Sequence, residues 1–146
     1  MGSFINIFTD GGARGNPGNA AIGVYITDSE NKKVSGFGKK IGISTNNVAE
    51  YKAVLEALDF VVGNKEKLGS SKKIYFFLDS LLVYSQITRL YKVKDSKLRN
   101  LLFSVWKKEE EIKIPIFYKH IPREENKKAD MYVNRALDGR GEGRFT

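Results

Sequence analysis

The sequence contains no cysteine and only one histidine, His120. Without cysteine the chain has no disulfide bond, no thiolate metal site and no cysteine nucleophile. A single histidine also excludes a zinc site built from three histidines. Hydrolytic chemistry in this chain is therefore expected to depend on carboxylates, although a serine–histidine pair stays open as an alternative.

Long apolar runs are also missing. Segments such as 74–78 are far shorter than the roughly 18 apolar residues that cross a bilayer, and the first residues lack the pattern of a signal peptide. We therefore expect a cytoplasmic protein with no membrane partner. Hydrophobic residues make up 41% and charged residues 29% of the chain, which is ordinary globular usage. The length of 146 residues predicts a single domain over 1–139, followed by a disordered tail over 140–146.

Positive charge is in excess. The chain has 25 lysines and arginines against 17 aspartates and glutamates, which gives a net charge of +8 and an isoelectric point near 9.6. Such a balance favours an anionic partner, most often nucleic acid, but a surface charged for solubility gives the same numbers.

Alternating hydrophobicity dominates the first third of the chain, and helical periodicity follows it. The glycine-rich segment 11–18 is interpreted as a loop, and Pro115 indicates an edge position for the last strand. Three antiparallel strands followed by strand–helix units predict an α/β fold with a five-stranded mixed sheet and flanking helices. The predicted strands are 4–10, 20–27, 33–43, 72–78 and 113–119; the predicted helices run from 45–46 to 63–64, from 79–80 through 91, from 95 to 110, and over 129–139.

Two aspartates stand where predicted strands end. Asp10 closes the first strand, and Asp79 directly follows the apolar strand 74–78. Ligands bind at the carboxyl ends of strands in open sheets. A purely structural reading competes for each residue, because Asp10 could cap the glycine turn and Asp79 could cap the following helix.

Two further acids share a face with apolar residues of predicted helices. Glu50 lies in line with Val54, Ala57 and Val61, and Asp130 repeats the pattern with 133 and 137. Burying an unpaired carboxylate costs several kcal/mol, so inward acids require positive charge nearby. A divalent cation held by oxygen ligands, Mg²⁺ or Mn²⁺ rather than Zn²⁺, is the compensator favoured here. A first-turn acid on the helix dipole for Glu50, and ion pairs of Asp130 with Arg135 or Arg99, remain alternatives.

Several motifs together resemble the type 1 ribonuclease H family. They are TDGGARGNPG at 9–18, TNNVAE at 45–50, LDS at 78–80, and His120 followed by Asn126 and Ala129-Asp130. They occur in the family's order and spacing across nearly the whole chain. The resemblance implies a sheet of three antiparallel and two parallel strands with flanking helices, which agrees with the elements predicted above.

The resemblance also implies an activity. Family members cleave the RNA strand of RNA–DNA hybrids endonucleolytically, leaving 3′-hydroxyl and 5′-phosphate ends. They use two Mg²⁺ ions, for which Mn²⁺ can substitute, held by carboxylates that correspond here to Asp10, Glu50, Asp79 and Asp130. His120 corresponds to a loop histidine proposed to assist proton transfer or product departure, against the simpler interpretation of a surface histidine.

Substrate contacts are implied for the glycine segment and for the start of the first helix. Backbone amides of the glycine segment approach the RNA strand, asparagines address the minor groove, and a threonine contacts a DNA phosphate. Helix capping and turn formation are the structural alternatives. The residues concerned are Gly11, Gly12, Ala13, Asn16, Thr45, Asn46 and Asn47.

The chain departs from the family pattern in two places. A basic, tryptophan-rich handle found in some members is replaced by a short link around 91–94, and Leu81 stands where some relatives have a groove-contacting glutamine. Neither change touches the implied metal ligands. An RNA–DNA hybrid is thus the predicted partner, with no obligate protein partner. A catalytically idle hybrid-binding module and a related metal-dependent nuclease, such as an exonuclease or integrase, are the alternatives.

Overall fold

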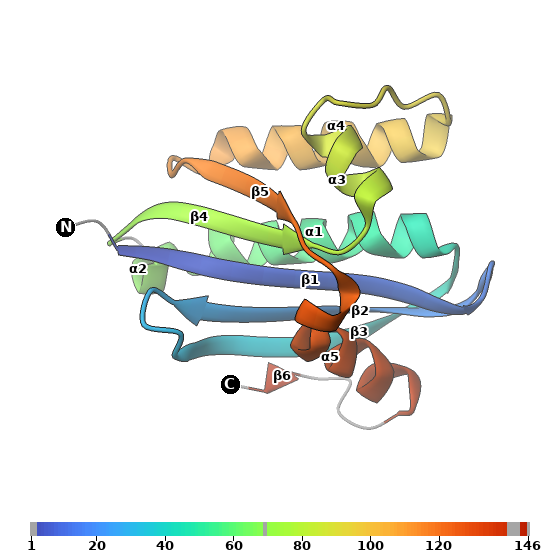
Figure 1. Ribbon diagram of the computed structural model, residues 1–146, viewed down its shortest axis with the longest axis horizontal. Helices are drawn as coiled ribbons and strands as arrows, with labels where there is room; N and C mark the ends of the chain where they lie inside the picture. The colour runs from blue at the N-terminus through green and yellow to red at the C-terminus, as the bar shows by residue number, and fades with distance from the viewer. Residues whose placement is uncertain (1–2, 69, 140–143, 146) are drawn as a thin grey trace.

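A single mixed sheet organises the chain. The computed structural model, shown in Figure 1, describes residues 3–68, 70–139 and 144–145. The strand order is β5-β4-β1-β2-β3-β6; β1, β2 and β3 pair antiparallel, and β4 and β5 extend the sheet in parallel. The predicted five-stranded mixed sheet is confirmed. Its strands are β1 (Ser3–Gly15), β2 (Gly18–Asp28), β3 (Lys33–Ser44), β4 (Ser71–Leu78) and β5 (Ile116–His120), to which the two residues of β6 (Arg144–Phe145) are added.

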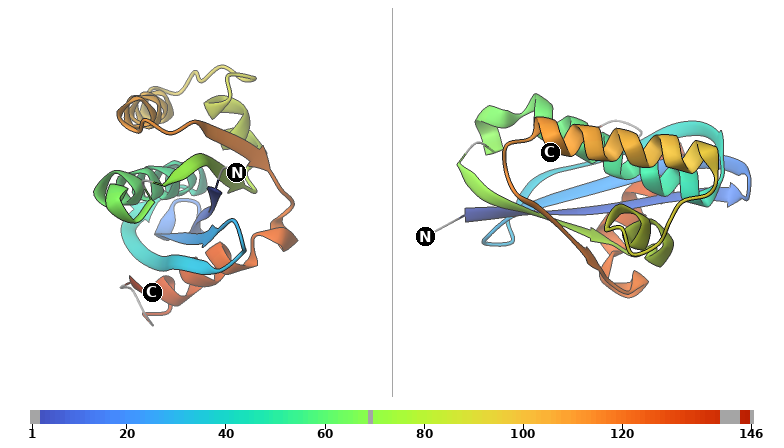
Figure 2. Two further views of the ribbon diagram at one scale, coloured as in Figure 1. Left: turned by 90° about the vertical axis from the view of Figure 1, so that its left-hand side faces the viewer. Right: turned by 90° about the horizontal axis from the view of Figure 1, so that it is seen from above.

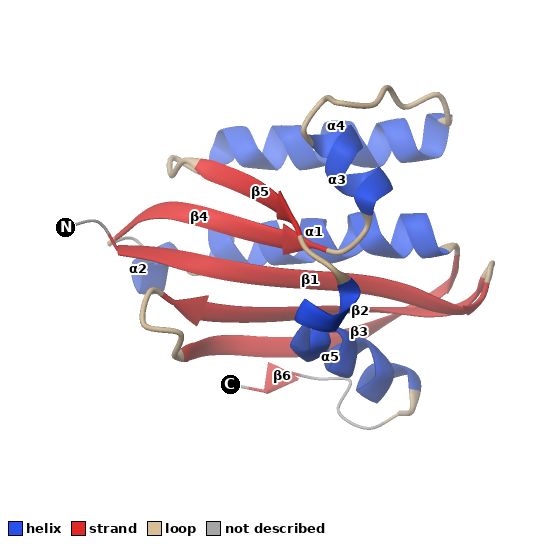
Figure 3. Cartoon of the chain, viewed as in Figure 1, coloured by secondary structure: helices blue, strands red, loops and turns tan. Residues whose placement is uncertain are grey.

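Helices lie on both faces of this sheet (Figure 2). α1 and α4 cover one face, where α1 packs on β1 and α4 packs on α1, while α5 crosses β2 and β3 on the other face. Figure 3 shows the segment between β5 and α5 passing in front of β1 on its way to that second face. The helices are α1 (Asn46–Gly63), α2 (Lys65–Leu68), α3 (Leu81–Ile87), α4 (Ser96–Glu111), the short 3₁₀ turn η1 (Arg123–Glu125) and α5 (Lys127–Leu137).

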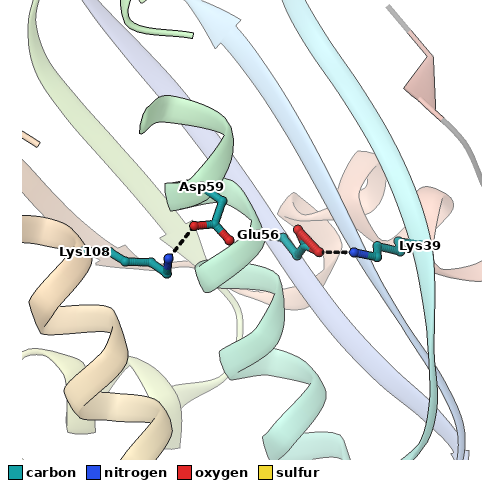
Figure 4. Close-up of polar contacts among 4 residues, drawn as sticks. All are labelled: Lys39, Glu56, Asp59 and Lys108. Carbon is teal, nitrogen blue, oxygen red and sulfur yellow. Dashed lines mark hydrogen bonds and ion pairs between the residues drawn. The ribbon is translucent and has the colours of Figure 1, made fainter. Parts of the chain in front are cut away.

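The core lies between the sheet and α1. Thr45 starts the helix as its N-cap, because its hydroxyl accepts a hydrogen bond from the Val48 N–H at 3.2 Å. The buried side of α1, including Tyr51, Val54 and Leu58, meets alternate residues of the central strands. On its outer side, the helix forms two ion pairs of 2.5 Å, Asp59 with Lys108 of α4 and Glu56 with Lys39 of β3 (Figure 4).

The glycine-rich segment is strand rather than loop, so this prediction was wrong. β1 continues to Gly15, and β2 begins at Gly18 after the turn of Asn16 and Pro17. Glycine serves close packing here: a Cβ on Gly11 would lie 2.2 Å from the carbonyl carbon of Ala49 in α1. At position 11 the glycine therefore reflects the approach of α1 and not a break in the ladder.

The helix after Asp79 is shorter than predicted. α3 ends at Ile87, Arg89 adopts a positive φ of 68°, and the N–H groups of Leu90 and Tyr91 both donate to the Ser85 carbonyl. This left-handed termination turns the chain away from the helix axis. Leu90 and Tyr91 are consequently 67% and 50% exposed, instead of continuing a buried stripe.

The predicted disordered tail needs correction at two residues. Arg144 and Phe145 pair antiparallel with Phe37 and Gly36, because β3 would otherwise leave its outer backbone groups unpaired. The other residues of 140–146 lie outside the described part of the chain. At the opposite edge, β5 is the last strand, as Pro115 predicted. Among the described residues, no helix combines the length and apolar character needed to span a bilayer.

Candidate active site

Three carboxylates converge beside the end of β4. Oxygen atoms of Asp10, Glu50 and Asp79 all lie within 4.8 Å of one another. Thr9 and Leu78 form the last pair between β1 and β4, so Asp10 and Asp79 follow the same step of the parallel ladder. Asp10 was predicted to close the first strand, and this is wrong. It lies within β1, which continues to Gly15 and beyond Asp10 pairs with β2 alone.

Glu50 enters this cluster from the first turns of α1. As predicted, it shares the buried side of the helix with Val54, Ala57 and Val61. The close contact between Gly11 and Ala49 sets the helix directly against β1, and the Gly11 backbone N–H donates to the Glu50 carboxyl group. The glycine thus brings the carboxyl groups of Asp10 and Glu50 together from two different elements.

The negative charges of the three carboxylates are not balanced by positive charges on the neighbouring described residues. Asp10 and Glu50 are only 8% and 5% exposed, and Glu50 Oε2 has no hydrogen-bond partner among the residues that the structure describes. Burial raises the pKa of Asp10 from 3.8 to about 7, with the charges of Asp79 and Asp130 adding to the rise; a hydrogen bond from Glu50 and the charge of Arg123 oppose it. Burial, and then the charge of Asp10, raise the pKa of Glu50 well above 4.5. Clustered oxygen ligands with an unpartnered buried atom fit a hard divalent cation.

Asp79 is held by Asn126, a residue whose role the sequence did not reveal. Asn126 Nδ2 donates to Asp79 Oδ2 at 2.9 Å and to the Thr9 carbonyl at 2.8 Å, and the side chain is fully buried. Ser80, not Asp79, caps α3 by accepting from the Val83 N–H at 3.2 Å. The capping interpretation of Asp79 was therefore wrong, and its carboxylate faces the cluster. The only signal for Asn126 in the sequence was its place between His120 and Asp130.

Asp130 differs from its prediction. It is exposed, whereas Ala129, Tyr132, Val133 and Ala136 form the buried side of α5. The helical face was misassigned by about one position, because 129, 133 and 136, spaced by four and then three, and 130, 133 and 137, spaced by three and then four, both follow helical periodicity. Asp130 lies outside the three-residue cluster, yet its charge contributes to the raised pKa of Asp10. Its role as a fourth ligand stays a prediction.

His120 lies at the end of β5, opposite Leu78. Its side chain is exposed, its Nε2 is 3.3 Å from the Asp79 backbone oxygen, and its ring is 5.8 Å from that of Tyr84 between centroids. The structure thus places the histidine beside the backbone of a cluster residue. Its proton-transfer role stays a prediction.

The predicted substrate-binding residues meet where β1 and β2 turn beside the start of α1. Asn16 Oδ1 accepts from the Asn46 N–H at 3.0 Å, and Asn46 Oδ1 accepts from the Ala13 N–H at 2.9 Å. Both amides therefore use their oxygen within the protein and keep Nδ2 as a donor. Asn16, Thr45 and Asn46 are exposed, Asn47 and Gly12 are half-buried, and Gly11 is buried.

Two of these residues also do what their structural alternatives proposed. Thr45 caps α1, and Asn16 forms part of the turn between β1 and β2. The capping bond holds Thr45 in place, and the turn holds Asn16 in place. The hydrogen bond of Asn16 to the Asn46 N–H uses Oδ1 and not Nδ2. At the start of α3, Leu81 presents an exposed apolar side chain.

The chain resembles known proteins along most of its length. A family model described as Reverse transcriptase-like matches residues 8–136. Ribonuclease HI of Halobacterium salinarum is 34% identical over 150 residues, covering 94% of this chain and 66% of that protein. Bifunctional protein Rv2228c of Mycobacterium tuberculosis is 36% identical over 135 residues, covering 92% of this chain. This chain spans about a third (35%) of the length of Rv2228c.

Solved structures share the fold and much of the sequence. LC11-RNase H1, isolated from compost by a metagenomic approach, has a TM-score of 0.87 and is 41% identical, over 92% of this chain and 96% of that one. The same protein in complex with an RNA/DNA hybrid has a TM-score of 0.85 at 39% identity, over 92% and 97% of the two chains. With its mixed sheet and carboxylate cluster, this chain belongs to the type 1 ribonuclease H family.

Proposed function

We propose that this chain hydrolyses the RNA strand of RNA–DNA hybrids at internal positions, leaving 3′-hydroxyl and 5′-phosphate ends. The observation that carries the proposal is the cluster of Asp10, Glu50 and Asp79 within 4.8 Å. Similarity to LC11-RNase H1, which has been solved with an RNA/DNA hybrid, supports the choice of substrate.

Divalent ions are part of the proposal. Asp10, Glu50 and Asp79 would hold two Mg²⁺ ions, with exposed Asp130 as a fourth ligand and Mn²⁺ as a substitute. Such ions supply an activated water and neutralise the leaving 3′-oxygen when bound. The unpartnered Glu50 Oε2 and the raised pKa values of Asp10 and Glu50 support this, because the described residues around both acids do not supply enough positive charge to offset their burial.

The chain's own residues then have distinct tasks. Asn126 fixes one oxygen of Asp79 and leaves the other for the cluster. His120, exposed beside the Asp79 backbone, would carry a proton to or from the reacting phosphate. Asn16 and Asn46 would donate through Nδ2 to base-edge and sugar oxygens in the minor groove, where RNA displays its 2′-hydroxyls. All of these groups come from one chain, so we propose that cleavage needs no protein partner. Cytoplasmic location stays a prediction from the sequence.

The test uses RNA–DNA, RNA–RNA and DNA–DNA duplexes of one sequence, each with and without Mg²⁺. Cleavage only of the RNA strand in the hybrid, only with the ion, and with products that a polymerase extends from their 3′ ends is expected. Hybrid binding without cleavage at any Mg²⁺ or Mn²⁺ concentration would instead establish an idle binding module. Equal cleavage of the DNA–DNA duplex would establish a different nuclease.

A further inference from the structure

One face of the sheet is only partly covered. α1 and α4 lie on the core side, and α5 packs mainly on β2 and β3 of the other side. Figure 1 looks onto that second side: α5 lies in front of β2 and β3, and no helix of the described chain lies in front of the left-hand halves of β4 and β5. Side chains that point toward the viewer from β4 and β5 therefore meet solvent.

Aromatic and cationic side chains fill this open face. Phe76 of β4 and Tyr118 of β5 point into the core side, so their neighbours along each strand point outward. The outward residues that form this aromatic face are Phe4 and Phe8 of β1, Lys73, Tyr75 and Phe77 of β4, and Phe117 and Lys119 of β5. No acid occurs in 3–9, 71–78 or 116–120, so the aromatic face is positively charged.

Phe117 has a ring face that no neighbouring strand covers. Tyr75 stacks against Phe117 from β4, with ring centroids 5.7 Å apart and an interplanar angle of 30°. β5 is the last strand of the sheet on that edge, and Phe117 is 45% exposed. By contrast, Phe8 and Phe77 stack on each other at 4.7 Å and are half-buried. The Tyr75–Phe117 stack thus ends in a ring that can accept one more flat group.

Positive charge lies directly beside this ring. Lys119 Nζ is 5.2 Å from the Tyr75 ring centroid, and Lys73 is exposed farther along β4. An open aromatic face next to lysines matches a nucleotide, whose base stacks on rings and whose phosphate attracts cations. Bases of a duplex are stacked on one another and are not free to stack on protein. The ligand with both features accessible is therefore a single strand.

We propose that the aromatic face binds single-stranded nucleic acid, with a base stacked on the outer face of Phe117 and phosphates beside Lys119 and Lys73. Sheets that present aromatic rings bind unpaired bases in this way. Phe117 precedes His120 by three residues of β5, about 10 Å along the strand. An unpaired strand that continues from a duplex held at the candidate active site can reach the face. Binding here goes beyond the proposed hydrolysis and does not depend on it.

Removal of the Phe117 ring tests the stacking. The ligands are a fluorophore-labelled oligothymidylate of about 15 nucleotides and a blunt-ended RNA–DNA hybrid, each titrated in EDTA by anisotropy. Phe117→Leu keeps an apolar side chain, and we expect it to raise the Kd for oligothymidylate about tenfold. The Kd for the blunt hybrid and the melting temperature should stay unchanged. The matched control is Phe103→Leu, at a phenylalanine of α4 that is 53% exposed, which should change neither Kd.

A double variant tests the role of charge. Lys73→Gln with Lys119→Gln removes two exposed lysines of the aromatic face, and Lys97→Gln with Lys107→Gln removes two exposed lysines of α4 as the control. Each lost phosphate contact lowers the slope of log affinity for a single strand against log salt by about 0.7. The first variant should therefore lower the slope for oligothymidylate by about 1.4, and the control should keep the wild-type slope.

The outcomes separate single-strand binding from the proposed hydrolysis. Loss of oligothymidylate affinity alone in Phe117→Leu supports the aromatic face even if wild-type protein does not cut the hybrid, in which case only the proposed hydrolysis is wrong. No oligothymidylate binding by wild-type protein, no loss in Phe117→Leu, or an equal loss for both ligands would overturn the proposal. A wild-type dimer that Phe117→Leu converts to a monomer in sedimentation would assign the face to a contact between copies and overturn it too.

Discussion

Asn126 joins the loop before α5 to Asp79: its Nδ2 lies 2.9 Å from Asp79 Oδ2 and 2.8 Å from the Thr9 carbonyl oxygen. The asparagine is 117 residues from Thr9 in sequence and 47 from Asp79. One buried amide therefore ties the middle of β1, at Thr9, to the residue that follows β4 and orients the Asp79 carboxylate.

Replacing Asn126 with alanine is expected to lower both activity and stability. The change leaves the Thr9 carbonyl unpaired and frees Asp79 to rotate, and a buried group left unsatisfied costs about 1–3 kcal/mol. We expect a lower melting temperature and a kcat reduced by more than tenfold, with hybrid KM little changed. Asn134→Ala, on the exposed side of the same α5 helix, is the control. A destabilised Asn126→Ala protein that keeps wild-type kcat at low temperature would leave the amide with a structural role only.

His120→Ala is expected to slow turnover while cleavage stays detectable. A group that carries a proton contributes about 10²–10⁴-fold, and the carboxylate cluster is left intact by this change. The single-turnover rate in Mg²⁺ should therefore fall while hybrid affinity persists. Unchanged single-turnover and steady-state rates would assign His120 to the surface and to no chemical step.

The raised pKa of Asp10 predicts how stability changes with pH in the metal-free protein. Its pKa is about 7 in the folded chain and about 3.8 when unfolded, so between these values the folded state binds more protons. The free energy of unfolding should then fall as pH rises from about 4 to 7, and level off above that range. Thermal melts in EDTA measure this fall, and melts in Mg²⁺ above pH 7 should show higher melting temperatures. Asp10→Asn should flatten the fall; an equally steep decline in that variant would assign the effect to other groups.

Hydrophobic patterns within single segments of the sequence predicted the strands and the buried face of α1. Alternation gave the strands, and the spacing of Glu50 with Val54, Ala57 and Val61 predicted a carboxyl group on the buried side of α1. Asp10 and Asp79 were singled out because each follows an apolar strand segment, and the structure brings them together through the parallel register of β1 and β4. Each of these needs only the periodicity of one element and the direction of its neighbour.

Features set by tertiary contacts were missed. Gly11 looked like a loop residue because glycine breaks regular structure on average, and its real constraint is Ala49 of a helix 38 positions away. Asp130 was placed inward because α5 offers two nearly equivalent faces, and packing on β2 and β3 selects the one through Ala129. The function of Asn126 depends on Thr9 and Asp79 and has no counterpart in nearby sequence.

Asp79→Asn separates an enzyme from a binding module. The asparagine keeps the shape of the side chain and removes the charge that a cation requires, so hybrid cleavage in Mg²⁺ should collapse while hybrid binding persists. The charge of Asp79 contributes to the raised pKa values of Asp10 and Glu50, so its removal relieves repulsion in the metal-free protein. The melting temperature in EDTA should therefore rise, and the further increase caused by Mg²⁺ should shrink.

The matched control is Asp28→Asn at the end of β2, where the carboxylate accepts from the backbone N–H groups of Glu30 and Lys32 in the turn before β3. The same chemical change at that distant position should leave cleavage and the effect of Mg²⁺ on melting unchanged. Wild-type cleavage by Asp79→Asn would remove Asp79 from the set of metal ligands. A lower melting temperature of Asp79→Asn in EDTA would show that its hydrogen bond with Asn126 outweighs repulsion within the cluster, because the two effects act on the same carboxylate with opposite sign.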